Sequence, residues 1–332
     1  MPLGSPSLDP ALPTTSSDSA PPGDQRGPKG YAYLVGTGIA MGAADVVPGV
    51  SGGTMAFILG IYRELIEAIK SFDLRLAGLV VRGRLRDAVD HVPWRFLVPL
   101  VSGILVSILS LAHAVSWLLE NRQSLLYAFF FGLVLASIVA VATEVRWSAR
   151  AVATLVTGTA VAYWIVGLVP VSAPNTPLIV FGSGVVAISA MILPGISGSF
   201  ILLILGQYAF ILASVKSFDL LALAPFLVGC AVGITGFARV LSWLFAYYQQ
   251  LTITLLIGFM IGSLRRIWPF KETVETMIDR HGEVVPKVQH NLMPDPASSE
   301  TWIALGLAIL GFVLIWLLDR LRRRLVETRA AA

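Results

Sequence analysis

The sequence has little charge and almost no cysteine, and both shortages narrow the class of protein. Only 13% of its 332 residues are charged, whereas 56% are hydrophobic and the mean hydropathy is +0.78. A soluble domain cannot bury so many apolar residues, so this composition is typical of a protein that lies in lipid. The single cysteine, Cys230, excludes an intramolecular disulfide and a metal site built from several cysteines.

Motifs that bind nucleotides or metals are missing as well. The sequence contains no glycine-rich nucleotide loop of the P-loop type and no HExxH zinc motif. We therefore predict no metal site, no catalytic residues and no cofactor. The net charge of +4 does not indicate a nucleic-acid partner, because Lys and Arg concentrate in the loops between apolar runs.

Six apolar runs are long enough to cross a bilayer, since a helix needs roughly 20 apolar residues to span a hydrocarbon core of about 30 Å. These runs cover residues 96–119, 125–143, 150–170, 222–244, 250–268 and 302–318. Shorter apolar stretches flank a Pro-Gly pair at 48–49 and again at 194–195, and none of them can span alone. The sequence predicts an all-α polytopic membrane protein with six full spans and two broken-helix hairpins, which either re-enter or cross fully.

The two ends of the chain differ from this apolar middle. Residues 1–30 contain seven prolines and no apolar core of a signal peptide, which predicts a disordered cytoplasmic tail. Residues 321–332 are predicted to be a basic cytoplasmic tail.

The chain contains an internal repeat. Residues 48–74, PGVSGGTMAFILGIYRELIEAIKSFDL, match residues 194–220, PGISGSFILLILGQYAFILASVKSFDL, with 13 of 27 positions identical at an offset of 146 (194 minus 48). The match resumes at an offset of 126, for example between Pro99 and Pro225. Chance likeness of two apolar stretches is the alternative, but the colinear Pro, Gly, Ser, Trp and Asp positions argue against it. We predict one membrane repeat over 31–170 and a second over 177–320, the latter with an outer loop at 269–300.

The distribution of Lys and Arg predicts the orientation of the chain. The 63–95 and 144–150 loops and the C-terminal tail are rich in arginine and should be cytoplasmic, so both termini lie on the cytoplasmic side. The uncharged 171–177 loop should be outside. Each half then crosses the membrane an odd number of times, which makes the second half inverted. Arg265 and Arg266 fall at the outer face and fit the rule less well.

The doubled Pro-Gly-x-Ser-Gly motif, at 48–52 and 194–198, is the candidate substrate site. Each copy breaks one helix and starts another, whose first N–H groups lack internal partners and attract anions. Irregular backbone at membrane depth is tolerated only where it is enclosed in protein or lines a cavity. Glycines that allow close helix packing and prolines that kink helices are the alternative explanation. The predicted phosphate-binding residues near these turns are Ser51, Gly52, Gly53, Thr54, Ser197, Gly198 and Ser199.

Few ionisable residues interrupt the apolar runs, and burying each one in lipid costs roughly 3 kcal/mol. Arg239 is predicted to bind the phosphate through a bidentate contact, with a structural ion pair as the alternative. Asp45 lies three residues before Pro48 and is predicted to carry a coupling proton, with helix capping as the alternative. His113 is interpreted as a structural histidine in the protein interior, with its hydrogen bonds made inside the protein.

The stretch GIAMGAADVVPGVSGGTMAFILGIY at 38–62, together with ILPGISGSFILLILGQY at 192–208, resembles the polyprenyl-phosphate transporter family. The resemblance extends over nearly the whole chain from about residue 30 to 320. It implies that the protein returns undecaprenyl phosphate, the lipid carrier of cell-wall precursors, from the outer to the inner leaflet of the cytoplasmic membrane. The implied partners are the polyprenyl phosphate lipid, the bilayer and protons.

Two other functions fit parts of the same pattern. An integral-membrane polyprenyl-pyrophosphate phosphatase also has inverted repeats and a PGxSRS-type segment, but Gly52 and Gly198 stand here where that motif has arginine. Its glutamate-rich ExxxE companion is missing too, since Glu64 and Glu67 are only three positions apart. A small-anion transporter of the same architecture is the third possibility.

Overall fold

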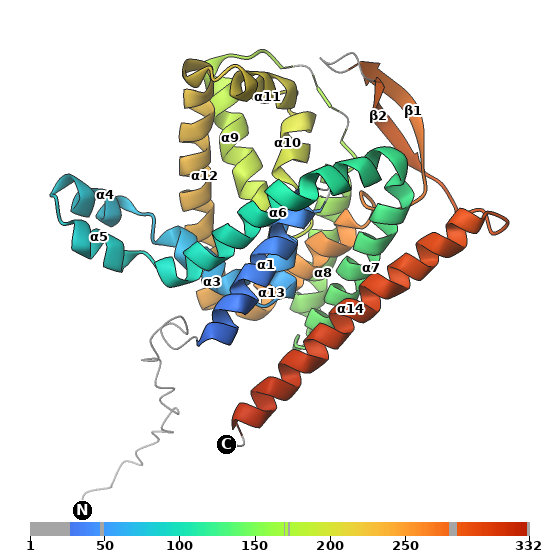
Figure 1. Ribbon diagram of the computed structural model, residues 1–332, viewed down its shortest axis with the longest axis horizontal. Helices are drawn as coiled ribbons and strands as arrows, with labels where there is room; N and C mark the ends of the chain where they lie inside the picture. Colours follow the sequence, from blue (N-terminus) through green and yellow to red (C-terminus); the bar gives the residue numbers. More distant parts are fainter. Residues whose placement is uncertain (1–26, 47–49, 169, 172, 279–283, 331–332) are drawn as a thin grey trace, which may run out of the picture.

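The structure is a computed structural model that describes residues 27–46, 50–168, 170–171, 173–278 and 284–330. It consists of helices apart from one two-stranded hairpin, so the predicted helical class is confirmed (Figure 1). The predicted tail at 1–30 lies outside the described residues except for 27–30, where the first helix begins. The predicted basic tail at 321–332 continues the last helix as far as Ala330.

The same order of helices occurs twice along the chain. The first half contains α1 (Pro28–Val46), α2 (Gly52–Ile58), α3 (Tyr62–Lys70), α4 (Leu74–Val81), α5 (Leu85–His91), α6 (Trp94–Asn121), α7 (Gln123–Ala142) and α8 (Ala149–Ile165). The second half contains α9 (Pro177–Ile192), α10 (Gly198–Ile204), α11 (Tyr208–Lys216), α12 (Leu220–Tyr247), α13 (Gln249–Ser263), β1 (Lys271–Ile278), β2 (Val284–Asn291) and α14 (Ser299–Ala330). Only α4 and α5 in the first half and the strands in the second lack counterparts, and the two extra helices account for the shift in offset.

Four of the six predicted spans form helices long and apolar enough to cross a membrane. They are α6, α7, α12 and the apolar part of α14. The runs at 150–170 and 250–268 form the shorter apolar helices α8 and α13, of 17 and 15 residues. Helices α10 and α11 would count as a fifth span, but they are bent by 114° at the break between them. This bend lies at residues 205–207, whereas the predicted hairpin turns at the Pro-Gly pair 194–195, which falls in the break between α9 and α10.

The helices pack in four close pairs: α1 with α6, α9 with α12, α8 with α13 and α7 with α14. Each pair depends on glycine, because a Cβ at the contact would collide with the facing backbone. A Cβ on Gly38 would lie 2.1 Å from the carbonyl oxygen of Leu100, and one on Gly229 would lie 2.2 Å from that of Phe181. Helices without a hydrophobic driving force between them associate through such small residues, as expected in lipid.

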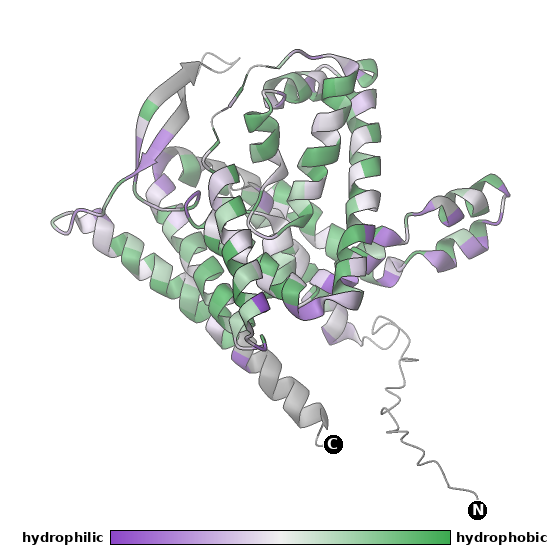
Figure 2. Cartoon of the chain, turned by 180° about the vertical axis from the view of Figure 1, so that it is seen from behind, coloured by the Kyte–Doolittle hydropathy of each residue, from purple (hydrophilic) through white to green (hydrophobic). Residues whose placement is uncertain are grey.

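The outer surface of the helices is apolar. Leu109 and Leu221 are 79% and 88% exposed, and both lie on long helices in which few residues are buried. Figure 2 shows that hydrophobic residues cover the helices, whereas hydrophilic residues gather on α4, α5 and the strands. Helix α7 lies deeper inside the protein, since half of its residues are buried. This distribution is the one expected of a multi-pass protein with its long helices in contact with lipid.

The predicted outer loop at 269–300 contains an antiparallel hairpin of β1 and β2. The hairpin is tied to the end of α13: Asn291 Nδ2 donates a hydrogen bond to the carbonyl oxygen of Arg265 at 2.9 Å, and Trp268 Nε1 donates to that of Leu292 at 2.9 Å. In Figure 1 the hairpin and α11 lie at the top, whereas the first residues of α1 and the end of α14 lie at the bottom.

A valine at Gly38 should destabilise the protein, whereas a valine at Gly36 should not. Both glycines lie on α1, so the change in helix propensity is the same, but no atom lies within 4 Å of a Cβ at Gly36. Overpacking a close helix contact costs about 1 to 3 kcal/mol. Thermal denaturation of the purified protein in detergent, followed by size exclusion, measures the difference. Equal melting temperatures for Gly38→Val and Gly36→Val would contradict the close α1–α6 contact.

Candidate functional site: the contact between two broken helices

The two Pro-Gly-x-Ser-Gly turns touch each other. The backbone N–H of Gly195 donates a hydrogen bond to Thr54 Oγ1 at 2.8 Å. In the other direction, Ser51 Oγ donates to the carbonyl oxygen of Met191 at 3.0 Å. Ser51 and Thr54 are both fully buried. Residues about 140 positions apart in the chain therefore form one compact unit, which we call the turn contact.

Local hydrogen bonds hold the first turn in place. Asp45 Oδ1 accepts from the backbone N–H of Gly52 at 2.6 Å, and Ser51 Oγ accepts from that of Gly53 at 3.1 Å. A Cβ on Gly53 would lie 2.8 Å from the carbonyl oxygen of Ile192, so only glycine permits this approach. Asp45 therefore caps α2, the role that was the alternative to proton transfer. Pro48, which begins the motif, lies outside the described residues.

The second turn uses glycine for its backbone shape. Gly195 has a φ of +93°, in the region that favours glycine, and a Cβ there would meet Ser263 Oγ at 2.5 Å. The second turn thus packs against the C-terminal end of α13. Ser197 is buried and Ser199 is exposed, and their hydroxyl oxygens lie 2.7 Å apart.

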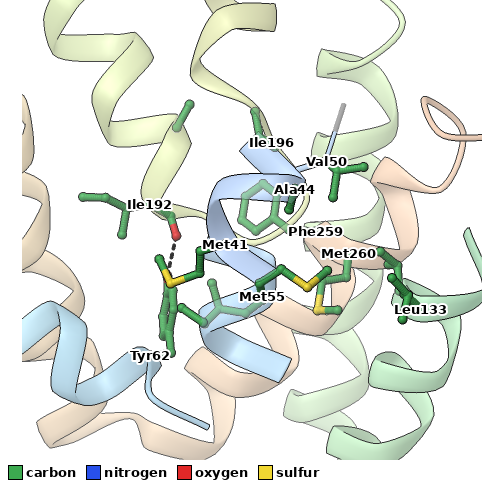
Figure 3. Packing of buried hydrophobic residues seen from close by; sticks show 14 of the residues in the cluster. Met41, Ala44, Val50, Met55, Tyr62, Leu133, Ile192, Ile196, Phe259 and Met260 are labelled. Atoms are coloured by element: carbon green, nitrogen blue, oxygen red, sulfur yellow. Dashed lines mark hydrogen bonds between the residues drawn. The ribbon is translucent and has the colours of Figure 1, made fainter. Parts of the chain in front are cut away.

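Apolar side chains surround the turn contact. Tyr62 donates its hydroxyl proton to the carbonyl oxygen of Ile192 at 3.0 Å, which adds another hydrogen bond between the halves near the turns (Figure 3). Met41, Met55 and Met260 lie close by in the same buried cluster. Unbranched methionine side chains fill irregular gaps, so they suit the uneven packing around two broken helices.

Two cavities lie at opposite ends of α13. The first, which we call the hairpin cavity, has a volume of about 680 Å³. The second, which we call the opposite cavity, has a volume of about 440 Å³. Ile261 and Leu264 line the hairpin cavity, whereas Gln249 and Ile253 line the opposite cavity. At 1.5 Å per residue, Gln249 and Ile261 are roughly 18 Å apart along the helix axis.

The turn contact lies between these two cavities. Phe57, at the far end of α2, lines the opposite cavity together with Tyr62. On the other side, the guanidinium of Arg266 lies 4.6 Å from the ring centre of Phe200 on α10, and Arg266 lines the hairpin cavity. Each broken helix therefore reaches from the turn contact towards a different cavity.

Not every predicted site residue joins this arrangement. Arg239 is exposed on α12 and makes no hydrogen bond or ion pair with any residue that the structure describes. The structure does not bring it to the turn contact. The side chain of His113 lies outside the described residues. Within the described ranges, no group of His, Cys, Asp and Glu could hold a metal ion.

Sequence reasoning missed the hairpin cavity, whose basic residues include Arg266 and Lys271. Arg266 gave a signal, because it departs from the positive-inside pattern. Lys271 gave none, since it lies in a polar loop whose fold was not predicted. Both cations are brought together by the turn after α13 and the hairpin that follows it.

Paired broken helices that meet between two cavities, in a multi-pass helical protein, define a membrane carrier. The undecaprenyl phosphate translocase-like family matches residues 41–285, and the chain belongs to this family. It is 45% identical over 258 residues to a polyprenyl-phosphate transporter of Vibrio cholerae, covering 77% of this chain and 84% of that protein. It is 31% identical to a polyprenyl-phosphate transporter of Staphylococcus aureus, covering 70% and 84%. No solved structure matches it.

Replacing Thr54 by valine should destabilise the turn contact. Valine has nearly the same shape but leaves the buried N–H of Gly195 without its acceptor, which costs about 1 to 3 kcal/mol. The control is Thr157→Val, because Thr157 is exposed and bonds only to the carbonyl oxygen of Ala153 in its own helix. Thermal denaturation in detergent should show a lower melting temperature for Thr54→Val alone. Equal stability of the two variants would mean that the turns do not need this bond.

Proposed function

We propose that the protein carries undecaprenyl phosphate across the cytoplasmic membrane and so recycles this lipid carrier from the outer to the inner leaflet. The names of the two relatives support a polyprenyl phosphate as the substrate. The observation that carries the proposal is the contact of two broken helices between two cavities. Such a contact separates the two sides of the membrane and opens to either side when the helices move.

The phosphate would cross at the turn contact. In the closed arrangement the buried hydroxyls of Ser51 and Thr54 are bonded to the other half of the chain, so they bind no headgroup. Separation of the turns would release these groups for an incoming phosphate. The proposed headgroup contacts are Ser51, Gly52, Gly53, Thr54, Ser197, Gly198 and Ser199. The polyprenyl tail would stay in lipid, against the exposed apolar faces of α6 and α12.

The orientation follows from the basic loops. The arginine-rich segment of α4 and α5 would lie on the cytoplasmic side, as would the start of α1 and the end of α14. The hairpin and α11 would lie on the outer side, at the other end of the molecule (Figure 1). The two halves would then be inverted copies, with the hairpin cavity outside and the opposite cavity inside.

A leaflet-resolved lipid assay in proteoliposomes tests the transport proposal. The purified protein should move a polyprenyl monophosphate between leaflets without releasing inorganic phosphate, and it should take up no soluble phosphate. Arg239→Gln belongs in the same series. The exposed arginine could reach a lipid phosphate only from the lipid side of α12, so a slower rate would support this proposed contact. Phosphate release would favour the phosphatase, and soluble phosphate uptake would favour the small-anion transporter.

Inward transport of a phosphate works against the membrane potential. A potential of 100 mV, negative inside, opposes each inward-moving negative charge by about 2.3 kcal/mol, so a dianionic headgroup faces about 4.6 kcal/mol. We propose that protons accompany the phosphate and that Asp45 carries one of them. Asp45 caps the helix that begins at the turn contact, so a proton on its carboxylate would weaken the hydrogen bond from Gly52 and favour movement of α2.

Asp45→Asn should abolish the response of transport to an imposed pH difference while the protein still folds. Asparagine retains an oxygen that accepts from Gly52 but does not take up a proton. The matched control is Asp219→Asn, because Asp219 Oδ1 caps α12 in the same way, at 3.1 Å from the N–H of Ala222. Transport in vesicles with a pH gradient measures the effect. If Asp45→Asn responds to the gradient as the parent does, Asp45 is only a helix cap.

A further inference from the structure

The hairpin cavity contains three basic residues that the proposed path does not use: Arg265, Arg266 and Lys271. They come from the turn that ends α13 and from the first residue of β1. None of the residues that line this cavity, all within the described part of the chain, is Asp or Glu. The cavity is therefore strongly cationic and contains no carboxylate that would neutralise it. The lining residues beside the three cations are Phe131, Tyr163, Val166, Gly167, Leu168, Pro170, Ile261, Leu264, Trp268, Gln289, His290 and Asn291.

Arg266 is the least satisfied of the three cations. Its Nε atom is buried and has no hydrogen-bond partner in the described part of the chain. Its guanidinium is held by the ring of Phe200, a contact that leaves the N–H groups free to bind an anion. A buried donor without an acceptor costs about as much as a lost hydrogen bond, so an arginine in this position is suited to bind an anionic acceptor.

Contacts without carboxylates also position the two other cations. Arg265 lies over the ring of Tyr163 at 4.4 Å and donates from Nη1 to the carbonyl oxygen of the same residue at 3.3 Å. Lys271 Nζ donates to the carbonyl oxygen of Arg266 and lies 4.5 Å from the ring centre of Tyr127. Ring and carbonyl contacts orient a cation without neutralising its charge. No carboxylate that lines the cavity therefore competes with an anion for these three basic groups.

The opposite cavity differs in charge at the corresponding place. The offset of 126 relates Arg266 to Ala140, which lines the opposite cavity. That cavity contains one arginine, Arg63, and one glutamate, Glu144, so its formal charges cancel. The two cavities therefore have related positions in the fold but unequal attraction for an anion.

We propose that the hairpin cavity is the binding site for the phosphate monoester group of the lipid before it crosses the turn contact. This inference rests on the proposed transport of a polyprenyl phosphate. Arg266 would bind the phosphate oxygens through its planar pair of N–H groups, and Lys271 would add a point charge. Trp268 and Phe131 offer an apolar wall to the first part of the tail. The stacked Phe200 links the bound phosphate to α10 and so to the turn contact.

The environment of Lys271 provides an independent readout. Burial, together with the nearby charge of Arg266, lowers the pKa of Lys271 to about 7. Arg265, Arg266, Tyr127, Tyr163 and His290 are the other titratable groups at the cavity, and no carboxylate lies among them. A bound phosphate dianion would raise the pKa of Lys271 again. At pH 8 the lysine is mostly neutral, so binding should be accompanied by proton uptake.

Isothermal titration of the purified full-length protein tests the site, with farnesyl phosphate, inorganic phosphate and farnesol as probes. Farnesyl phosphate should bind, and Arg266→Gln should weaken it by about 10- to 100-fold, which corresponds to the loss of a charge-assisted hydrogen bond. Arg150→Gln is the control, because Arg150 is exposed and lies in neither cavity. If Arg266→Gln does not fold, as judged by size exclusion, Lys271→Gln provides the measurement.

Titration at pH 8 in two buffers of different ionisation enthalpy gives the proton uptake. The parent and Arg150→Gln should take up a proton with farnesyl phosphate, and Lys271→Gln should take up none. Competition by inorganic phosphate would show that the phosphate group suffices, whereas its failure to compete would show that the tail contributes. Both results support the site. Equal affinity of parent, Arg266→Gln and Lys271→Gln for farnesyl phosphate, or equally tight binding of farnesol, would overturn it.

The binding and transport measurements can contradict the proposed site and the proposed transport function independently. If the parent transports lipid but Arg266→Gln binds and transports as the parent does, the cavity is not the site although the transport function stands. If the parent binds farnesyl phosphate through Arg266 but moves no lipid between leaflets, the site stands and the transport function is wrong.

Discussion

Backbone hydrogen bonding inside lipid is the constraint on which this structure depends. Water is absent at membrane depth, so a helix that breaks there must find other partners for its free N–H and carbonyl groups. The two halves of the chain supply these partners to each other: Thr54 accepts from Gly195, and Ser51 donates to Met191. Neither turn is satisfied without the other. The broken helices can therefore exist in lipid only as a pair, and a pair that separates must exchange these bonds for others, such as bonds to a phosphate.

The helix pairs around the turns hold the two halves together. Glycine contacts bring α1 against α6 and α9 against α12 within each half, whereas α7 packs on α14 and α8 packs on α13 across the halves. Because the last helix of each half, α8 or α14, packs against the other half, neither half forms a closed unit by itself. The cross-packed helices α7 and α13 also line both cavities. Any movement of one half against the other therefore changes the cavities and the turn contact together.

The sequence predicted those features that repeat. The matching blocks at offsets of 146 and 126 identified the duplicated order of helices, and the doubled motif identified the residues that touch. Periodicity does not say which face of α12 points inward, so the exposure of Arg239, which was predicted to bind the phosphate, could not be foreseen. The hairpin of β1 and β2 was interpreted as a loop because its residues carry no core pattern. Arg266 and Lys271 could not be paired from sequence, since their proximity depends on that hairpin.

The α4–α5 segment of the first half and the β1–β2 hairpin of the second half have no counterparts, and both affect where positive charge lies. In the proposed orientation, three cations on the outer side oppose the positive-inside tendency and would favour an inverted chain. The α4–α5 insertion adds four arginines on the other side, at positions 75, 82, 84 and 86, where the second half has none. These charges lie close to the ends of α3 and α6, so in this orientation they would direct the topology of the first half before the second is made. In the proposed orientation, the insertion in one half would thus allow the other half to place cations where a phosphate in the outer leaflet can reach them.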